Sequence, residues 1–339
     1  MSDAGDLDQL LTLSARAGRD PLLTQASSGN TSIKLNGTLW IKASGTWLAN
    51  AADGAALVPV ALNDLRTRLR NATEFTGAGA WVNGRYRRAS VETAMHAILP
   101  HRVVIHVHSI NTLAWAVRCD GPARLRERLE GLNWTWVPYV PSGLPLARAI
   151  ELAISEQPGT RIFVLANHGL VVCGASCEEA EKVLQEVEMR VQSPIRPNPS
   201  PPCEASLRPL VDDTWRLPDF PALHQFGTDP VSSRIAVRGT LFPCQAIFLG
   251  NSAFRILENL GILVSRHFTA SQQCVLNGLF EVVRRIPEDA PIRYLTDAEV
   301  ADLLTEDAHN YHLSTENNAP PELQRLNRTA EPISEIATR

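Results

Sequence analysis

Hydrophobic positions in the first 190 residues alternate between the spacing of helices and the spacing of strands. The leucine-rich segment from Leu7 to Leu13 repeats with a helical period and predicts an opening helix. Residues 31–35 and 39–42 have the composition of short strands, and the Asn36-Gly37 pair between them is typical of a tight hairpin turn. This alternation predicts a layered α/β domain.

A second set of elements follows residue 89. Ser90 is predicted to be the N-cap of a helix that carries Glu92 and ends before Pro100. Ser176 and Glu179 have the spacing of a capping box and predict the start of another helix. Strands are predicted at residues 103–108, 161–166 and 170–173.

A proline-rich segment then divides the chain. Five prolines between residues 194 and 202 exclude both helix and ladder pairing there. We therefore expect a main domain at 1–192, a linker at 193–204, a small α/β domain at 205–314 and a loosely ordered tail at 315–339. The small domain is predicted to contain strands at 245–249 and 262–264 and capping boxes at Thr269 with Gln272 and at Thr296 with Glu299.

Composition and charge narrow the class of protein. With 44% hydrophobic and 20% charged residues over 339 positions, the chain has the usage of an ordinary globular protein. A net charge of −4, without a basic run interleaved with aromatics, argues against nucleic acid as a partner. There is no apolar run of about eighteen residues and no leader-like N-terminus, and the six cysteines are irregularly spaced. We expect a cytoplasmic protein with reduced thiols and no membrane segment.

Three histidines are candidates for a metal site. His106 and His108 are two apart on a predicted strand, so both project from one face while the flanking valines and isoleucine project from the other. Two imidazoles on an otherwise apolar strand are costly to bury unless something such as a divalent metal binds them. His168 lies in Asn167-His168-Gly169 between two predicted strands, where it fits either a third ligand or a structural loop histidine. Three such ligands would leave a coordination position open for water or substrate.

Glu92 and two glycine-containing segments could complete a site. An acidic residue in a first helical turn can simply stabilise the helix dipole, so Glu92 alone does not indicate catalysis. Residues 26–32 and 42–46 are small and hydroxyl-rich, which suits contacts to phosphate or carboxylate but also suits plain turns. Neither segment has the lysine spacing of a P-loop.

Taken in order, five segments of the chain resemble the class II aldolase/adducin family over about residues 5–190. The segments are Ser28-Gly29-Asn30-Thr31-Ser32, Ser44-Gly45, Ser90-Val91-Glu92, His106-Val107-His108-Ser109 and Asn167-His168-Gly169-Leu170. The resemblance implies a three-layer fold with a central mostly antiparallel sheet flanked by helices. It also implies a ring-like homotetramer with sites at subunit interfaces, and the aromatic segment 134–139 could supply apolar contact area.

The resemblance also assigns roles to single residues. It implies that His106, His108 and His168 hold Zn²⁺ or a related ion such as Mn²⁺ or Co²⁺, and that Glu92 is the acid/base. The aldolases of the family have Glu at this position, whereas the epimerases tend to have Asp. Positions implied to bind the phosphate of a sugar phosphate are Asn30, Ser44, Gly45 and Ser90. Val91 replaces the second hydroxyl residue of that phosphate site, so this part of the resemblance is incomplete.

A lyase mechanism follows as an expectation. The metal would act as a Lewis acid on a ketose or sugar phosphate and stabilise the enediolate left when a C–C bond breaks. Glu92 would move the proton, helped if burial raises its pKa towards neutrality. Alternatives are an epimerase, a decarboxylase or a dehydratase with the same chemistry, or a non-catalytic adducin-like scaffold, which would not need the ligands. Proton donors from a neighbouring subunit could be Tyr86, Tyr139, Tyr294 or Tyr311.

Overall fold

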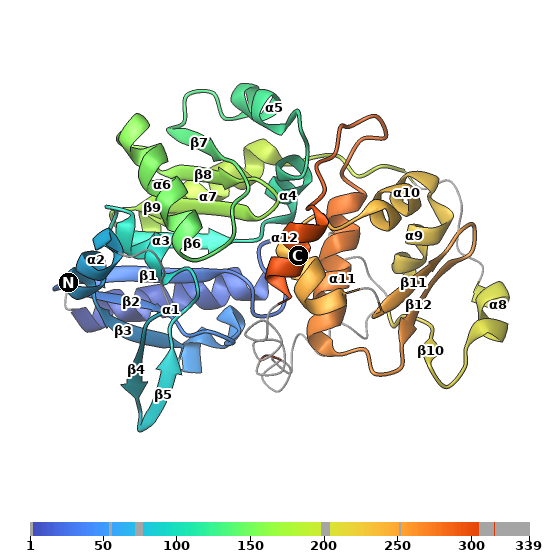
Figure 1. Cartoon of the computed structure of the whole chain (residues 1–339), viewed down its shortest axis with the longest axis horizontal. Helices are drawn as coiled ribbons and strands as arrows, with labels where there is room; N and C mark the ends of the chain where they lie inside the picture. The colour runs from blue at the N-terminus through green and yellow to red at the C-terminus, as the bar shows by residue number, and fades with distance from the viewer. Residues whose placement is uncertain are drawn as a thin grey trace.

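A seven-stranded sheet forms the centre of the N-terminal part of the protein in the computed structural model, which describes residues 3–53, 56–71, 77–197, 204–250, 252–304 and 315 (Figure 1). The strand order is β3-β2-β1-β6-β9-β8-β7, and β7 pairs with β8 in parallel while the other neighbours are antiparallel. The predicted mostly antiparallel sheet is therefore confirmed. Its strands are β1 (Asn30–Leu35), β2 (Thr38–Lys42), β3 (Leu57–Ala61), β6 (Val103–Val107), β7 (Trp134–Val137), β8 (Ile162–Leu165) and β9 (Gly169–Gly174).

Helices cover both faces of this sheet. They are α1 (Asp3–Arg19), α2 (Leu62–Asn71), α3 (Thr93–Ile98), α4 (Ile110–Ala116), α5 (Gly121–Arg128), α6 (Leu144–Glu156) and α7 (Cys177–Val191), together with the 3-10 turn η1 (Leu48–Asp53). Successive side chains along β6 point to opposite faces of the sheet. Ile105 and Val107 pack with residues of α1 and α7, whereas Val104 packs with residues of α3 and α6. The three-layer arrangement follows from this alternation.

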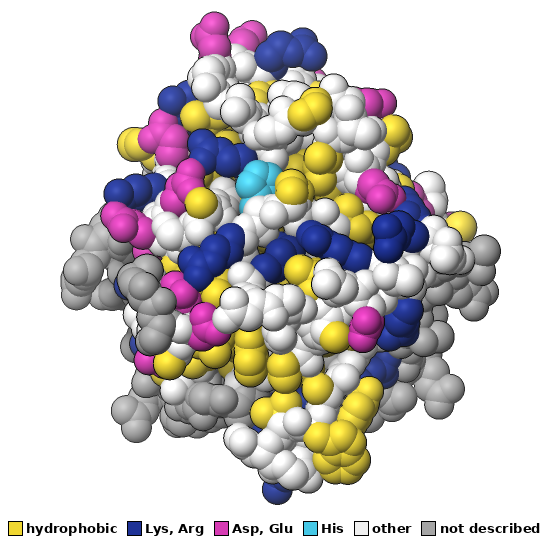
Figure 2. Space-filling view, turned by 90° about the vertical axis from the view of Figure 1, so that its left-hand side faces the viewer, with side chains coloured by type: hydrophobic (Ala, Val, Ile, Leu, Met, Phe, Trp, Pro, Cys, Tyr) yellow, Lys and Arg dark blue, Asp and Glu magenta, His cyan; other side chains and the backbone are white. Residues whose placement is uncertain are grey.

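The N-terminal part contains two hairpins, one within the seven-stranded sheet and one that forms a separate two-stranded sheet. In the first, the Asn36-Gly37 turn predicted from sequence joins β1 to β2, with both residues at positive φ (46° and 80°), as a two-residue turn requires. In the second, β4 (Gly79–Val82) pairs with β5 (Arg85–Arg88) and projects from the body of the molecule (Figure 1). Trp81 on this hairpin is 73% exposed, and Figure 2 shows hydrophobic side chains at the lower end of the face where the hairpin lies.

Two predicted helix starts differ from the structure in detail. The helix after residue 90 begins at Thr93, so Glu92 occupies the N-cap position and the prediction of Ser90 there is wrong. Ser90 instead forms a turn, because its carbonyl oxygen accepts a hydrogen bond from Thr93 N and its hydroxyl accepts one from Glu92 N. At α7 the Ser176 cap is confirmed, but the Glu179 carboxylate reaches back to Ala175 N.

The C-terminal part has a smaller sheet packed with helices. The strands are β10 (Trp215–Arg216), β11 (Phe254–Leu257) and β12 (Gly261–Ser265), in the order β10-β12-β11. The helices are α8 (Glu204–Leu207), α9 (Gln225–Thr228), α10 (Pro230–Arg238), α11 (Ala270–Val283) and α12 (Asp297–Leu303), with the short turns η2 (Arg208–Leu210), η3 (Pro221–His224) and η4 (Gln245–Leu249). The predicted α/β appendage, the strand at 262–264 and both capping boxes are confirmed.

The predicted strand at 245–249 is wrong. This segment, η4, is one turn of π-helix. A short apolar run fits a buried strand and a buried helix equally well by composition, and here Phe248 and Leu249 enter the hydrophobic core from a helical turn. The Gln245 side chain accepts a hydrogen bond from Leu241 N and fixes the approach to the turn.

One hydrophobic cluster contains residues from both parts of the chain. Trp47, Ile110 and Leu113 of the N-terminal part pack in the same cluster as side chains of β12 and α11. A Cβ atom on Gly278 of α11 would lie 2.7 Å from Gln25 Cγ, so the two parts approach closely. Residues 192–197 form no helix or strand, and Arg196 N donates to Arg284 O in the C-terminal part. Residues 198–203 and the tail, except Thr315, lie outside the described residues, so the domain boundaries stay predictions.

Candidate metal centre and active site

The three predicted histidines converge at one end of the central sheet. His106 is in β6, His108 directly follows it, and His168 lies in the β8–β9 turn. Val107 pairs with Leu170 at the end of the β6–β9 ladder. His108 follows Val107 directly and His168 precedes Leu170 by two residues, so both histidines lie at this end of the sheet. The ring centroids are 5.0 to 5.1 Å apart, and one potential ligand atom from each ring lies within 4.8 Å of the others. Among the residues that the structure describes, this is the one group of three or more His, Cys, Asp or Glu side chains with that spacing.

Two glycines allow the strands and loops around the histidines to approach each other. A Cβ atom on Gly169 would lie 2.5 Å from Val107 O and 3.3 Å from His108 Cα. Gly29 has a φ of +67°, and a Cβ atom there would lie 2.8 Å from His106 O. Real Cβ atoms do not come this close, so a larger residue at either position would displace the backbone of a histidine.

Hydrogen bonding fixes which nitrogen of His106 can accept a metal. His106 Nδ1 donates its proton to Leu170 O at 3.0 Å, which leaves Nε2 without a proton. His106 Nε2 lies 3.2 Å from His108 Nε2. For comparison, two nitrogens at ordinary Zn–N distances on a tetrahedral ion are about 3.4 Å apart.

Burial keeps the imidazoles of His106 and His108 in the neutral form that binds metals. The His106 and His168 side chains are 0% and 5% exposed, and His108 as a whole residue is 7% exposed. Burial lowers the pKa of His106 to about 4, with a smaller opposing effect from Glu92. Burial and the neighbouring rings lower the pKa of His108 well below its usual value. His106 and His108 therefore offer neutral nitrogen donors at neutral pH, which suits zinc and related transition ions.

Glu92 contacts two of the three histidines. Its Oε2 is 3.3 Å from His106 Nε2 and its Oε1 is 3.2 Å from His168 Nε2. The carboxylate also accepts hydrogen bonds from Asn30 Nδ2 at 2.7 Å and from Ser142 Oγ at 3.3 Å. Glu92 therefore lies beside the histidine cluster, and its acid/base role stays a prediction.

The expected rise of the Glu92 pKa does not occur. Burial by itself raises this pKa, but His106, His168 and the Asn30 hydrogen bond together outweigh burial and lower it well below the usual value. A carboxylate that accepts hydrogen bonds from a fixed amide is stabilised in its charged form. Glu92 is therefore a carboxylate at neutral pH, which is the form that accepts a proton.

A hydrogen-bonded chain that sequence reasoning did not identify holds Glu92. Ser32 Oγ lies 2.7 Å from His96 Nδ1, and His96 Nε2 contacts Asn30 Oδ1. Burial lowers the pKa of His96 to about 3, so the ring is neutral; its Nε2–H donates to the amide oxygen and its Nδ1 accepts from Ser32. Asn30 can then donate from Nδ2 to Glu92 and, at 3.0 Å, to Ser90 Oγ. A histidine four residues after Glu92 on an otherwise apolar helix was the available signal for this chain.

The residues expected to bind phosphate lie on adjoining segments. Asn30 and Ser90 are beside Glu92, as just described. Ser90 N donates to Lys42 O at 3.0 Å and Ser44 N donates to Arg88 O at 2.8 Å, so the loop with Ser44 and Gly45 continues from the strand end next to Ser90. The four positions are thus brought to one side of the site, and their binding role stays a prediction.

Lys42 is a second site residue that sequence reasoning did not single out. Its side chain is buried, and Nζ donates to Ser27 O at 2.6 Å. Burial lowers its pKa to about 7, against the opposing charges of Glu92 and Cys244. A lysine that ends a strand just before a hydroxyl-rich loop was the signal in the sequence.

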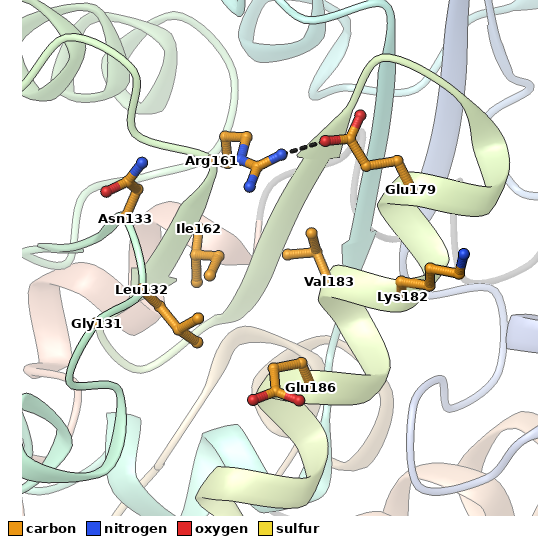
Figure 3. A pocket seen from close by; sticks show the side chains of 9 residues that line it. All are labelled: Gly131, Leu132, Asn133, Arg161, Ile162, Glu179, Lys182, Val183 and Glu186. Atoms are coloured by element: carbon orange, nitrogen blue, oxygen red, sulfur yellow. Dashed lines mark hydrogen bonds and ion pairs between the residues drawn. The ribbon is translucent and has the colours of Figure 1, made fainter.

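The pocket in Figure 3 is separate from this centre. It has a volume of about 350 Å³ and lies between the start of β8 and α7, where Arg161 pairs with Glu179 (Figure 3). Ile162 in its wall is the first residue of β8, whereas His168 lies in the turn that follows the last residue of that strand, so the pocket and the histidine cluster are at opposite ends of β8. Of the four candidate tyrosines, Tyr86 is 58% exposed and Tyr311 lies outside the described residues. The Tyr294 hydroxyl donates a hydrogen bond to Ile235 O, and the Tyr139 ring stacks with the Arg293 guanidinium.

The N-terminal part matches a known protein family. The family described as class II aldolase and adducin N-terminal domain matches residues 9–193. A protein from Bacillus subtilis named uncharacterized oxidoreductase YuxG is 24% identical over 209 residues, covering 56% of this chain and 30% of the relative. A 3-oxo-tetronate 4-phosphate decarboxylase from Escherichia coli is 29% identical over 137 residues, covering 34% of this chain and 58% of the relative. The chain thus spans about a third of the first relative and somewhat more than half of the second.

Solved structures with a similar N-terminal part are also known. The N-terminal class II aldolase domain of a conserved protein from Thermoplasma acidophilum is 24% identical, with a TM-score of 0.49, over 56% of this chain and 94% of that chain. An L-fuculose-1-phosphate aldolase from Thermus thermophilus is 18% identical, with a TM-score of 0.39, over 55% of this chain and 91% of that chain.

Proposed function

The chain belongs to the class II aldolase and adducin family, and we propose that it is a divalent-metal-dependent lyase that cleaves a C–C bond of a ketose or sugar phosphate. The observation that carries the proposal is the contact between the Glu92 carboxylate and two members of a buried three-histidine cluster. A scaffold protein would have no use for three imidazoles and a carboxylate enclosed together, because burying them is costly without a bound ion.

In this proposal the three histidines hold Zn²⁺, or Mn²⁺ or Co²⁺, through ring nitrogens. The ion would supply Lewis-acid polarisation of the substrate carbonyl. Glu92 accepts and returns the proton, and Asn30 and Ser142 keep its carboxylate oriented. Asn30, Ser44, Gly45 and Ser90 would bind the anionic end of the substrate, and the Lys42 amine beside them would add a positive charge when protonated.

A decarboxylase is the second candidate. The E. coli relative carries that activity in its name, and loss of CO₂ from a 3-oxo acid also needs a polarised carbonyl and a proton donor. A product assay over sugar phosphates and 3-oxo acid phosphates separates the two reactions. Epimerase and dehydratase activities belong in the same panel.

We also propose that the enzyme is cytoplasmic and forms a homotetramer. Cys119, Cys173, Cys177 and Cys244 are free thiols, as is usual for the cytoplasm. Among the described residues, no helix is long and apolar enough to cross a membrane. The exposed Trp81 and Tyr86 rings on the β4–β5 hairpin offer apolar area for subunit contact. Light scattering at micromolar concentration should give four times the chain mass, and a monomer would contradict this assembly.

Two substitutions test the site by separating metal binding from proton transfer. His108→Ala should lose most of the bound metal and the activity together, because two imidazoles leave too few donors. Glu92→Gln should retain metal and lose about a hundredfold or more in turnover, since an amide cannot exchange the proton. Metal content by elemental analysis and steady-state rates on the product panel are the measurements.

Matched variants control for burial and charge. His101→Ala removes a half-buried histidine outside the cluster, and Glu188→Gln replaces a half-buried carboxyl outside it. Both controls should keep metal and activity. A fully active Glu92→Gln protein would remove Glu92 from the mechanism, and unchanged metal in His108→Ala would overturn the ligand set.

A further inference from the structure

The C-terminal part of the chain, which lies outside the family match, reaches the histidine cluster directly. Cys244 is at the start of η4 and is buried. Its Sγ lies 3.2 Å from His108 Nδ1, on the side of the ring opposite the nitrogen that faces His106. A residue more than one hundred positions away in sequence therefore contacts a candidate metal ligand.

A second contact holds the loop that carries His168. Asn167 is fully buried at a φ of +51°, and its Nδ2 donates to Leu241 O and to Arg293 O, both at 2.8 Å. Arg293 Nη1 returns a hydrogen bond to Asn167 Oδ1 at 3.0 Å. All of the groups that bind the Asn167 side chain in this way belong to the C-terminal part.

These contacts have the form that metal-binding histidines require. An imidazole that ligates a metal through one nitrogen carries a proton on the other and donates it to a fixed acceptor, which sets the ring orientation and the tautomer. His106 uses Leu170 O for this purpose. The corresponding nitrogen of His108 faces the Cys244 sulfur, which is a weak acceptor but a large and polarisable one.

We propose that the C-terminal part forms the outer layer of the metal centre, with Cys244 as the positioning residue of His108 and the Asn167 contacts as the anchor of the His168 loop. The inference rests on the proposed function, because it concerns the same metal. It assigns to the C-terminal part a role that the family match, which ends at residue 193, does not cover.

The C-terminal contacts are rigid enough for this role. Leu241 and Cys244 belong to the hydrophobic cluster shared by both parts of the chain. Leu241 N donates to the Gln245 side chain, and the Arg293 guanidinium pairs with Glu299 at 2.6 Å. Partners whose own positions are fixed by packing can hold a ligand within the narrow geometry that metal binding needs.

Metal affinity of the full-length protein tests the role of Cys244. We would titrate metal-free wild type and variants with Zn²⁺ against a chromophoric chelator, and record the visible spectrum of the Co²⁺ form. Cys244→Ala leaves the His108 Nδ1 proton without its acceptor and should weaken zinc binding about 10- to 100-fold. Cys244→Ser restores an acceptor and should stay within a few-fold of wild type. Its Co²⁺ spectrum should match wild type, whereas that of Cys244→Ala should shift.

The control is Cys177→Ala, because Cys177 has nearly the same exposure (6% against 7%) and lies in the cluster on the other face of the sheet. Its zinc affinity should be unchanged whatever stability it loses. Asn167→Gly keeps the left-handed backbone accessible while removing the anchor, and should weaken zinc binding about tenfold.

The outcomes distinguish this inference from the proposed function. Wild type that binds zinc tightly, together with Cys244→Ala and Asn167→Gly variants of equal affinity, would overturn the inference and leave the lyase proposal intact. A Cys244→Ser variant as weak as Cys244→Ala would also overturn the acceptor role. Wild type that binds none of the divalent ions would overturn both.

Discussion

Two lysines, the half-buried Lys34 and the buried Lys42, lie where the uncharged amine is favoured. Lys34 Nζ donates to His101 O at 2.7 Å and Lys42 Nζ donates to Ser27 O at 2.6 Å. Burial lowers the pKa of each to about 7. A lysine in the unfolded chain keeps its proton to about pH 10.4. Between these values the unfolded state binds more protons than the folded state, so both lysines make stability rise with pH.

Replacing Lys34 should remove part of this pH dependence. The free energy of unfolding of wild type should rise relative to that of Lys34→Met by up to about 1.4 kcal/mol per pH unit between pH 7.5 and 9. Urea denaturation in the presence of EDTA at several pH values in that window measures the difference. Lys182→Met is the control, because Lys182 is 71% exposed and its removal should shift stability equally at each pH. Parallel wild-type and Lys34→Met curves would show that the Lys34 amine stays charged.

At the residue scale, the sequence predicts the parts of the site that have a local signal. His106 and His108 share a strand face, and His168 and Glu92 stand in recognisable short segments. Cys244 has no such signal, because its contact with His108 depends on where the chain returns in three dimensions. The ionisation state of Glu92 could not be predicted from the sequence either. Burial alone predicts a raised pKa, and the hydrogen bonds that reverse it are visible only in the structure.

At the element scale, the loops between strands carry the site, and their close approach depends on glycine. Gly29→Ala should lower the free energy of unfolding by about 1 to 2 kcal/mol, because the backbone at residue 29 is left-handed. It should lower it further because the new Cβ atom would meet His106 O. It should also weaken zinc binding, because His106 has to move. Urea denaturation and zinc titration measure the two effects.

Gly159→Ala separates backbone strain from the close approach. Gly159 also has a left-handed φ, of +87°, but a Cβ atom there would meet nothing within 4 Å. Backbone strain alone should lower the free energy of unfolding of this variant, and it should bind zinc as wild type does. Equal losses and equal zinc affinities in the two variants would show that the approach of Gly29 to His106 has no role in the site.

Element prediction succeeded where periodicity and turn chemistry agree. The Asn36-Gly37 hairpin and the Thr269 and Thr296 capping boxes follow from local rules that the structure obeys. The start of α3 differs from the prediction because the Ser90 hydroxyl and carbonyl accept hydrogen bonds within a turn that precedes the helix. The prediction of a strand at 245–249 is wrong because the four consecutive apolar residues 246–249 are too few to show a period that distinguishes helix from strand.

At the scale of the whole molecule, the two parts of the chain share hydrophobic packing. The cluster that joins them includes Ile110 and Leu113 of α4 and Leu276 and Leu279 of α11. The proline-rich segment predicts where one domain ends and the next begins, but the residues of the shared cluster can be identified only in the structure. A shared core predicts that the parts unfold together, since neither can open without exposing apolar surface of the other.

Paired core substitutions test this cooperativity. Leu279→Ala in the C-terminal part and Leu113→Ala in the N-terminal part each leave a cavity at a fully buried position and should lower the free energy of unfolding by about 2 to 5 kcal/mol. Pulsed hydrogen exchange with mass spectrometry along a urea series gives separate midpoints for peptides from β6 and from β12. If the core is shared, each substitution lowers both midpoints by the same amount, because a local cavity then destabilises one cooperative unit. Leu152→Ala, at a position 59% exposed on α6, should leave both midpoints nearly unchanged. If Leu279→Ala moved the β12 midpoint alone, the two parts would be independent domains, and the C-terminal part could not hold the metal centre rigidly.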